Sequence, residues 1–466
     1  MERYKYILDE SAIPTHWYNV QADLPQPLLP PIDPATKMPV DLAKMTAIFP
    51  AECVAQEVSS ERWIEIPDEV RDKLAIWRPT PLHRARRLEK VLDTPARIYY
   101  KYEGVSPAGS HKLNTAVAQA YYLKKEGGTR CTTETGAGQW GSSMAMAAKL
   151  FGLACQVYMV RISYDQKPYR RILMETWGAK VDASPSPLTA AGRAILAKDP
   201  DTPGSLSMAI AEGMEDALNT KGSKYLLGSL LNHVIMHQTV IGQEARKQME
   251  MAGDYPDIII GCCAGGSSFG GLAFPFLRDR LVNGAKTRFM PVEPTACPSL
   301  TRGEFRYDYG DSNKLTPLIP MHTLGHTFIP AKIHAGGLRH HGMGPLISHL
   351  YNLGHMEPRA YNQMKVFESA RLFAQCEGFI PAPESAHGLR AAIDEALRCK
   401  AAGRAEVILF NMSGHGLFDL SAYDEFNNGR MQPYDLPEEE IRRTLKDIES
   451  QPRTEEIAAA LAGMSK

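Results

Sequence analysis

Short runs rich in apolar, β-branched or aromatic residues alternate with helical segments along most of this chain of 466 residues. A strand that is apolar along nearly its whole length fits a parallel sheet covered by helices on both faces. Alternation of such strands with helices is typical of α/β proteins. The pattern therefore predicts an α/β fold with mainly parallel sheets flanked by helices. The predicted strands are 97–102, 130–134, 155–160, 258–263, 288–293 and 407–411.

Three helices in the first half are predicted from their periodicity and from the residues at their ends. They span 112–125, 141–150 and 170–177. Ser110 is the expected N-cap of the first helix, and the pair Gly127 and Gly128 is its expected stop.

The chain divides into four predicted regions. Residues 1–78 are rich in proline and form an N-terminal extension, an extended arm followed by short helices. Residues 79–245 form a smaller lobe and residues 246–440 a larger lobe, followed by a helical tail at 441–466. Residues 296–345 are rich in Gly, Pro and His, and we expect them to be an irregular functional loop.

The composition indicates a protein that acts on small molecules. The formal net charge is −1, so no overall field attracts nucleic acid or acidic membranes. None of the eight cysteines forms a CxxC pair, which is typical of reduced thiols in a cytoplasmic protein. The sequence lacks the apolar segments of a signal peptide or a membrane span. We therefore expect a cytoplasmic protein without nucleic-acid or membrane partners.

Lys112 lies at the start of the first predicted helix, directly after His111. An amine attacks an aldehyde only when it is unprotonated, and the positive end of a helix dipole disfavours the ammonium form. His111 could add to that charge or contact an anion. Taken alone, the motif is more typical of a surface lysine, so its interpretation depends on other motifs.

A second motif, Ala264-Gly-Gly-Ser-Ser268, follows the predicted strand 258–263. Ligands of parallel sheets bind where strands end and helices begin. Small residues let successive backbone N–H groups converge on a phosphate, and Ser267 and Ser268 add hydroxyl donors. Such a turn is often only a tight turn. A lysine amine together with a phosphate loop, however, is what pyridoxal phosphate requires.

The third motif is Glu134-Thr-Gly-Ala-Gly-Gln139, again at the end of a predicted strand. Its backbone and side-chain donors suit an amino-acid carboxylate, and Glu134 places a carboxylate beside them. The alternative is a strand-to-helix turn with a solvated glutamate.

The fourth motif is Asn411-Met-Ser-Gly414, after the last predicted strand. Ser413 could face the ring nitrogen of the cofactor. A hydroxyl there leaves the pyridine neutral, which makes it a weaker electron sink and favours β-elimination. Otherwise Ser413 is a helix cap.

Two groups of histidines invite other interpretations. His233 and His237 are four residues apart on a helical segment, a spacing found in zinc sites. The pair lacks the glutamate of HExxH and a third ligand, so no metal site is predicted. His340–His341, His322 and His326 fit contacts to substrate or phosphate better than metal ligands.

In their order, these motifs closely resemble the tryptophan synthase β-chain family of fold-type-II pyridoxal phosphate enzymes. The resemblance runs from Arg78 to about Leu420. Ser110–Asn114 resembles the family's motif with the imine lysine, and Pro383–His387 resembles a stretch near its cofactor. The other three motifs resemble its phosphate loop, its carboxylate loop with the catalytic glutamate, and its segment with the ring-nitrogen serine.

The resemblance implies a two-lobed fold-type-II architecture and a role for each matching residue. Lys112 and Glu134 are the implied catalytic residues. The implied cofactor-binding residues are His111, Lys112, Asn114, Ser229, Ala264, Gly265, Gly266, Ser267, Ser268, Glu384 and Ser413. The implied substrate-binding residues are Thr135, Gly136, Ala137, Gly138, Gln139, Trp140 and Arg339.

The resemblance also implies a reaction that joins indole and L-serine to L-tryptophan and water with pyridoxal 5′-phosphate. Lys112 would remove the α-proton of serine, and Glu134 would take up the N–H proton of indole. We expect a homodimer. An α-subunit partner and a monovalent cation, K⁺ or Na⁺, stay open.

Three departures from the family pattern leave alternatives. Trp140 and Ser268 stand where the family usually has His and Asn, and Arg339 stands where it has Asp, as in a longer second class of β chains. Arg339 could favour an anionic leaving group, as in O-phosphoserine. A related β-eliminase of the serine or threonine dehydratase type is the other alternative. Glu134 argues against it, because a dehydratase has no indole nitrogen to serve.

Overall fold

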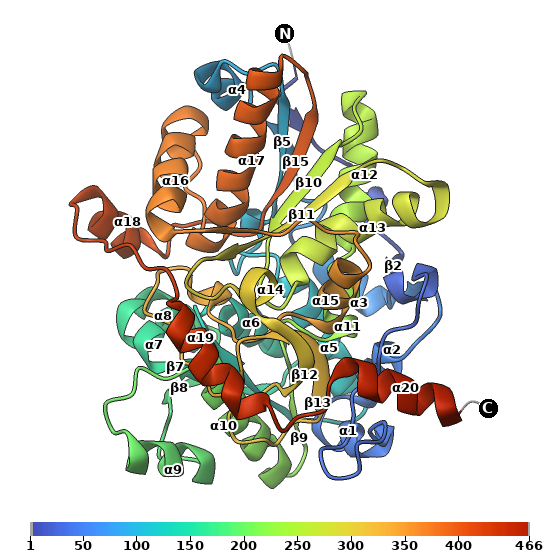
Figure 1. The fold of residues 1–466 in the computed structure, drawn as a ribbon, viewed down its shortest axis with the longest axis vertical. Helices are drawn as coiled ribbons and strands as arrows, with labels where there is room; N and C mark the ends of the chain where they lie inside the picture. Colours follow the sequence, from blue (N-terminus) through green and yellow to red (C-terminus); the bar gives the residue numbers. More distant parts are fainter. Residues whose placement is uncertain (1–2, 465–466) are drawn as a thin grey trace.

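Strands from distant parts of the chain meet in one large sheet. In the computed structural model, which describes residues 3–464, seven strands pair in the order β1–β4–β5–β15–β10–β11–β14 (Figure 1). The strands from β5 to β14 are parallel, and β1 and β4 add an antiparallel edge. Their bounds are β1 Lys5–Tyr6, β4 Leu82–Arg84, β5 Arg97–Tyr102, β15 Val407–Met412, β10 Ile258–Cys262, β11 Arg288–Pro294 and β14 Arg359–Tyr361.

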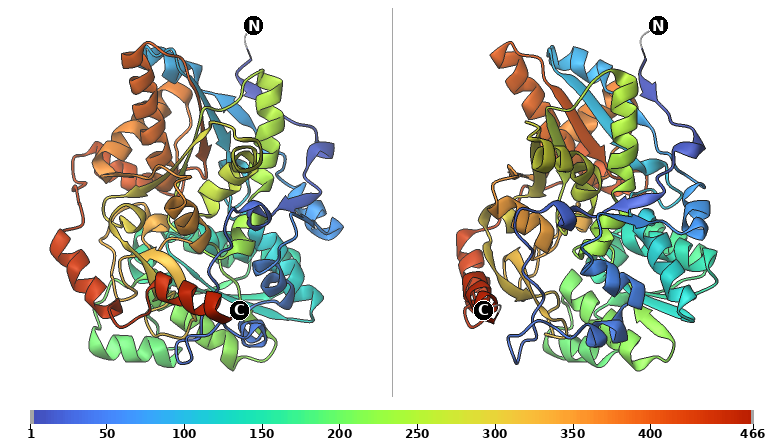
Figure 2. Two further views of the ribbon diagram at one scale, coloured as in Figure 1. Left: turned by 45° about the vertical axis from the view of Figure 1, so that its right-hand side comes forward. Right: turned by 90° about the vertical axis from the view of Figure 1, so that its right-hand side faces the viewer.

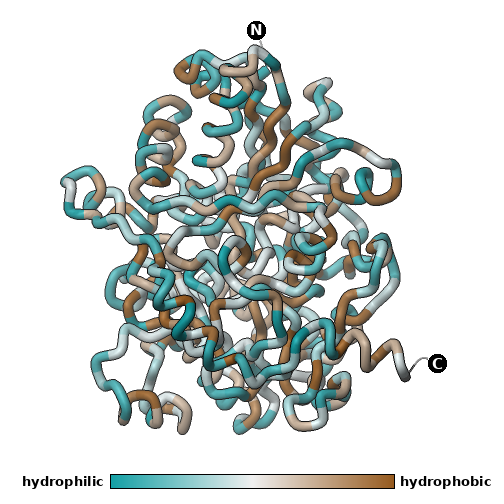
Figure 3. The backbone as a smooth tube through the Cα atoms, viewed as in Figure 1, coloured by the Kyte–Doolittle hydropathy of each residue, from teal (hydrophilic) through white to brown (hydrophobic). Residues whose placement is uncertain are grey.

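Both faces of this sheet are buried, as its apolar strands predict. Ile258 and Ile260 of β10 pack on one face and Ile259 on the other, because successive side chains alternate along a strand. Helix α17 (Pro383–Ala402), backed by α16 (Gln363–Glu377), covers the first face. Helix α13 (Ser267–Asn283), backed by α12 (Val240–Ala252), covers the second. Figure 3 shows apolar residues along the central strands.

A second sheet has four parallel strands in the order β8–β7–β6–β9. Helix α6 (Gln139–Leu150) packs on one face, with α5 (Leu113–Lys125) behind it, and α10 (Leu206–Asn219) covers the other face. The strands are β8 Lys180–Ser184, β7 Ala154–Val160, β6 Arg130–Thr135 and β9 Ser223–Tyr225. The predicted α/β fold with mainly parallel sheets is confirmed, and each predicted strand lies within two residues of its expected bounds.

The two sheets do not follow the predicted lobe boundaries. Strand β5 belongs to the predicted smaller lobe (79–245), yet it pairs with β15 in the large sheet. Such a pairing joins residues about 300 apart in the chain and leaves no trace in the local sequence. The division at residues 79, 246 and 441 stays a prediction.

Residues 296–345 are not wholly irregular, contrary to expectation. They contain an antiparallel hairpin of β12 (Glu304–Tyr309) and β13 (Leu318–Thr323). Tyr307 and Tyr309 pack into one small core, so the strand has the period of two that marks a half-buried strand. Glycine, proline and histidine around the hairpin hid this pattern.

The N-terminal extension follows one side of the molecule (blue in Figure 2). It contains the short helices α1 (Leu42–Ile48), α2 (Ala51–Glu57) and α3 (Asp68–Leu74). The tail contains α19 (Glu438–Leu445) and α20 (Thr454–Met464), and α20 packs beside β12. Within residues 3–464, no helix is long and apolar enough to cross a membrane.

Candidate active site

Lys112 is the N-cap residue of α5, close to where the sequence places it. Its Nζ donates a hydrogen bond of 3.0 Å to the carbonyl oxygen of Gly228. Burial lowers the pKa of Lys112, and the nearby Glu134 carboxylate opposes that shift. A lowered pKa increases the fraction of free amine, the form that reacts with an aldehyde.

Ser110 does not cap α5, so this prediction is wrong. Its buried hydroxyl has no hydrogen-bond partner among the described residues, and no side chain caps the helix. The backbone at Ser110 instead forms a bridge with Gly414. That bridge ties the lysine loop to the segment after β15, and the chain becomes helical only at Lys112.

The loop 264–268 connects β10 to α13, as predicted. Gly266 is the N-cap of α13 with a φ of 100°, a conformation that favours glycine. A Cβ on Gly265 would lie 2.2 Å from the Oγ of Ser229. No side chain caps α13, so its first N–H groups are available to an anion.

A cavity of about 330 Å³ joins the lysine, the phosphate loop and the serine after β15. All the predicted cofactor-binding residues except Asn114 line it. Its lining residues are His111, Lys112, Gln139, Ser229, Cys262, Ala264, Gly265, Gly266, Ser267, Ser268, Gly337, Leu338, Glu384 and Ser413.

His111 contacts the phosphate loop as a neutral side chain. Its Nε2 lies 3.1 Å from the Oγ of Ser267. Burial, with a smaller contribution from Lys112, lowers the pKa of His111 to about 3. His111 therefore adds no positive charge near neutral pH, and of its two predicted roles only the contact remains.

Hydrogen bonds within this cavity connect its loops. The Oγ of Ser413 lies 2.8 Å from the Oγ of Ser385 at the start of α17. Glu384 accepts hydrogen bonds from Nε2 of Gln139 at 3.0 Å and from the backbone N–H of Gly337 at 2.8 Å. Glu384 thus links the carboxylate loop to the segment that contains Arg339.

Glu134 lies at the end of β6 and lines a second cavity, which it shares with Lys112. Its side chain is 3% exposed, and burial raises its pKa to about 7. The hydroxyl of Tyr225 donates a hydrogen bond to its Oε2. A carboxyl group with a pKa near neutral can both accept and release a proton.

The segment after Glu134 forms the turn into α6. The Oγ1 of Thr135 accepts hydrogen bonds from the N–H groups of Gly138 and Gly141 at 3.2 and 3.1 Å. Gly138 has a φ of 95° and does not line either cavity. The other predicted residues of this loop do line the cavity of Glu134; they are Thr135, Gly136, Ala137, Gln139 and Trp140.

The cavity of Glu134 encloses about 610 Å³ and has a large apolar wall. The Nε1 of Trp140 donates to the Oγ1 of Thr133 at 2.5 Å, and a Cβ on Gly228 would lie 2.3 Å from the indole ring of Trp140. Trp140 is therefore fixed against the cavity wall. The aliphatic wall residues are Leu206, Ile210, Leu227 and Leu230.

Arg339 lies outside both of these cavities. It lines a smaller neighbouring cavity with Gly136 and Gly336. Its Nη2 donates to the Oγ of Ser163 at 2.5 Å, and burial lowers its pKa. The structure thus separates Arg339 from the space beside Lys112.

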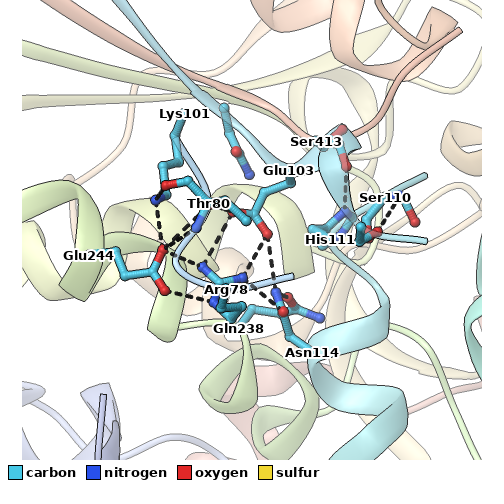
Figure 4. A network of polar contacts seen from close by, with 12 residues as sticks. Arg78, Thr80, Lys101, Glu103, Ser110, His111, Asn114, Gln238, Glu244 and Ser413 are labelled. Carbon is cyan, nitrogen blue, oxygen red and sulfur yellow. Dashed lines mark hydrogen bonds and ion pairs between the residues drawn. The ribbon is translucent and has the colours of Figure 1, made fainter. Parts of the chain in front are cut away.

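Asn114 belongs to a buried network of charged and polar side chains, not to the cofactor cavity (Figure 4). Its Oδ1 accepts a hydrogen bond of 2.9 Å from Arg78, and its Nδ2 donates to Glu103 and Gln238. Arg78 in turn contacts Glu103 at 2.9 Å and Glu244 at 2.8 Å. The amide of Asn114 is thus fully used by this network.

The other histidines have structural partners. Glu57 of the extension accepts a bond of 2.7 Å from His233, and Gln56 lies 2.8 Å from His237. His340 lines the cavity of Glu134, whereas His341 bonds to the carbonyl oxygen of Tyr309. His326 pairs with Asp308 and His322 packs against Phe305.

Tyr225 is a site residue that sequence reasoning missed. It lies in the short segment Ser223-Lys-Tyr225, which has no motif and little apolar character. Only the pairing of β9 with β6 brings it to Glu134. No local sequence signal marks it.

Comparison with known proteins gives consistent matches. Residues 74–414 match the family model described as pyridoxal-phosphate dependent enzyme. "Tryptophan synthase beta chain 2" of Aquifex aeolicus is 59% identical over 431 residues, 92% of this chain and 99% of the relative. "Tryptophan synthase beta chain" of Thermococcus onnurineus is 56% identical over 436 residues, 93% of this chain and 98% of the relative.

Two solved structures share the fold at low sequence identity. A fungal L-serine ammonia-lyase from Rhizomucor miehei matches with a TM-score of 0.56 at 16% identity, over 76% of this chain and 98% of that one. A bacterial threonine deaminase, from the organism abbreviated T.th., matches with a TM-score of 0.51 at 20% identity, over 72% of this chain and 93% of that one.

Proposed function

Because this chain belongs to the pyridoxal-phosphate dependent enzymes and, within them, to the tryptophan synthase β chains, we propose that it joins indole to L-serine, giving L-tryptophan and water. Lys112 and Glu134 are its catalytic groups in this proposal. The observation that carries it is a single cavity that contains a lysine amine, a buried carboxyl group and an apolar wall.

The cofactor cavity has the chemistry that pyridoxal phosphate needs. Lys112 offers an amine of lowered pKa to the aldehyde. The start of α13, without a side-chain cap, and the hydroxyl of Ser267 offer donors to the phosphate. The hydroxyl of Ser413 would serve the ring nitrogen. When bound, the cofactor withdraws electrons from the α-carbon of serine, so that the α-proton and the β-hydroxyl can leave.

The carboxylate loop would hold serine beside Lys112. Thr135, Gly136 and Ala137 follow β6, and Gln139 begins α6, where the helix dipole favours a carboxylate. In this position the α-proton of serine is taken up at Nζ of Lys112. The surrounding protein excludes water, which protects the reactive carbon until indole arrives.

Glu134 and the apolar wall would bind indole. Leu206, Ile210 and Leu227 supply the apolar contacts that a fused aromatic ring requires. Positive charge develops on the indole nitrogen as its C3 attacks, and the Glu134 carboxylate takes up the N–H proton. A pKa near 7 suits this exchange, since the carboxyl group then both gains and releases a proton at neutral pH.

The discriminating experiment follows the products formed from L-serine with and without indole. The purified holoenzyme should form tryptophan when both are present. Glu134→Gln should slow tryptophan formation by about 10²–10⁴-fold, while exchange of the serine α-proton with solvent continues. Pyruvate and ammonia as the main products in the presence of indole would instead support a dehydratase.

The O-phosphoserine alternative depends on Arg339. Its guanidinium group is bonded to Ser163 in a neighbouring cavity, so no observation favours phosphoserine over serine. Turnover of the two substrates can be compared directly. A homodimer, an α-subunit partner, a monovalent cation and a cytoplasmic location stay predictions.

A further inference from the structure

One tyrosine connects the N-terminal extension to Glu134. The phenol of Tyr225 donates a hydrogen bond to the Oε2 of Glu134. The other contact of its ring is Phe49, which lies between α1 and α2 of the extension; the ring centroids are 5.9 Å apart at an interplanar angle of 58°. The extension is thus one side chain away from the carboxyl group.

The ring of Tyr225 is held on several sides. Met45, Phe49 and Val54 of the extension form one apolar cluster with Tyr225 and with Ile210 of α10. A Cβ on Gly213 would lie 2.9 Å from the Cε2 of Tyr225, so α10 packs against the ring as closely as glycine allows. Ile210 also lines the cavity of Glu134, so the cluster forms part of the cavity wall.

Polar contacts fix the extension beside β9. Lys224, the neighbour of Tyr225, donates hydrogen bonds to the carbonyl oxygens of Thr46 and Ala47 in the last turn of α1, where a cation is favoured. On the other flank, Glu57 accepts hydrogen bonds from the backbone N–H groups of Asn232 and His233 at 3.0 Å. Phe49 is therefore anchored between two bonded segments.

We propose that Tyr225 is a positioning residue for Glu134 and that Phe49 of the extension keeps Tyr225 in place, an inference that rests on the function proposed for Glu134. The phenol engages Oε2, which leaves Oε1 to meet the indole N–H group. The extension thereby supports carbon–carbon bond formation without contacting the substrate.

The groups around Glu134 determine the expected pH effect. The hydrogen bond from Tyr225 and the charge of Lys112 both lower the pKa of Glu134 against the larger effect of burial. The carboxylates of α10 are directed elsewhere, Glu212 to Ser186 and Asp216 to Arg130. Asp311 acts on Tyr225, and His340 lines the same cavity. Loss of the phenol should therefore raise the pKa of Glu134 and reduce its ionised fraction at neutral pH.

The test is Tyr225→Phe in the holoenzyme, which removes one oxygen and keeps the ring. The acid limb of the pH profile for tryptophan formation should move up by roughly one pH unit. Exchange of the serine α-proton, which depends on Lys112, should keep its rate. In the cofactor-free protein, the infrared band of protonated Glu134, identified by its loss in Glu134→Gln, should titrate at a higher pH.

Matched variants separate this role from general destabilisation. Tyr158→Phe is the control in the same sheet, because the Tyr158 hydroxyl donates to Asp216 at 2.9 Å; its pH profile should match that of the unmodified protein. Phe49→Leu should move the acid limb in the same direction by a smaller amount. Val70→Ala, which loosens a buried contact of the extension far from Tyr225, should leave the limb in place.

An unmoved acid limb and an unmoved infrared titration in Tyr225→Phe would overturn the proposal. So would a loss of activity that is equal at every pH. If the unmodified enzyme forms no tryptophan from serine and indole, the proposed function fails instead. The infrared titration tests the contact between Tyr225 and Glu134 in either case.

Discussion

Glu103 and Glu134 are both enclosed by protein, with 0% and 3% of their surfaces exposed, yet their pKa values move in opposite directions. Burial alone raises the pKa of a carboxyl group. Around Glu103, Arg78 and Lys101 overcome this effect and hold its pKa below the usual range. Glu134 has the neutral phenol of Tyr225 as its hydrogen-bond partner, and its pKa rises to about 7.

The two buried lysines show the same contrast in their hydrogen bonds. Lys101 donates to the carbonyl oxygen of Thr80, to Glu244 and to Gln248 at 2.6, 2.7 and 2.8 Å. Lys112 donates one bond, to the carbonyl oxygen of Gly228. A charged group with a full set of partners stays ionised and structural, whereas a group with few partners is free to exchange a proton or react.

Replacing Lys112 should have the largest effect. Lys112→Ala should lower the rate of tryptophan formation by roughly 10⁴-fold, because it removes the only amine in the cavity with a lowered pKa among the described residues. Steady-state rates and the visible absorbance of the holoenzyme measure this. Lys124→Ala, an exposed position on the same helix, is the control. Retained activity in Lys112→Ala would end the contrast.

Breaking the buried network should lower stability more than any change at Glu134. Arg78→Met leaves Glu103 and Glu244 buried without their main cation and should cost about 3–5 kcal/mol of unfolding free energy. Denaturant unfolding measures this. The exposed pair of Arg443 and Glu440 offers a control, since Arg443→Met should cost less than about 1 kcal/mol. Equal losses in the two variants would contradict the account.

Glu134→Gln should stabilise the cofactor-free protein at high pH. The folded pKa of Glu134 is raised to about 7, so its ionisation weakens the fold as the pH rises from about 4.5 through 7. The amide should therefore gain roughly 1–3 kcal/mol at pH 8 and little at pH 4. Glu103 contributes with the opposite sign, because its stabilisation is lost as the pH falls through its depressed folded pKa. A variant less stable than the parent at pH 8 would refute this.

Ser110→Ala should have the smallest effect. The hydroxyl has no partner among residues 3–464, so its loss should change the unfolding free energy of the cofactor-free protein by less than about 0.5 kcal/mol. The denaturation midpoint measures this. A cost of about 1 kcal/mol or more would restore Ser110 as a helix cap.

The strands and the loops at their ends could be predicted because local sequence determines both. Strand β10 is an apolar run, and Gly265 and Gly266 after it fill positions that a Cβ would obstruct. Lys112 and Glu134 were found in the same way, from motifs that local turns require. These features depend on neighbours in the chain.

Features that depend on distant partners could not be predicted. Asn114 stands two residues from Lys112, yet its amide serves Arg78 and Glu103. Tyr225 reaches Glu134 only because β9 pairs with β6. Whether a polar side chain joins a network or a cavity is decided by long-range packing, which leaves no period or motif.

Reduction of the holoenzyme with borohydride, followed by peptide mapping, tests the contrast most directly. The account predicts that the pyridoxyl group is fixed on the peptide that contains Lys112, while Lys101 stays unmodified. Modification of Lys101, or of any lysine other than Lys112, would contradict it.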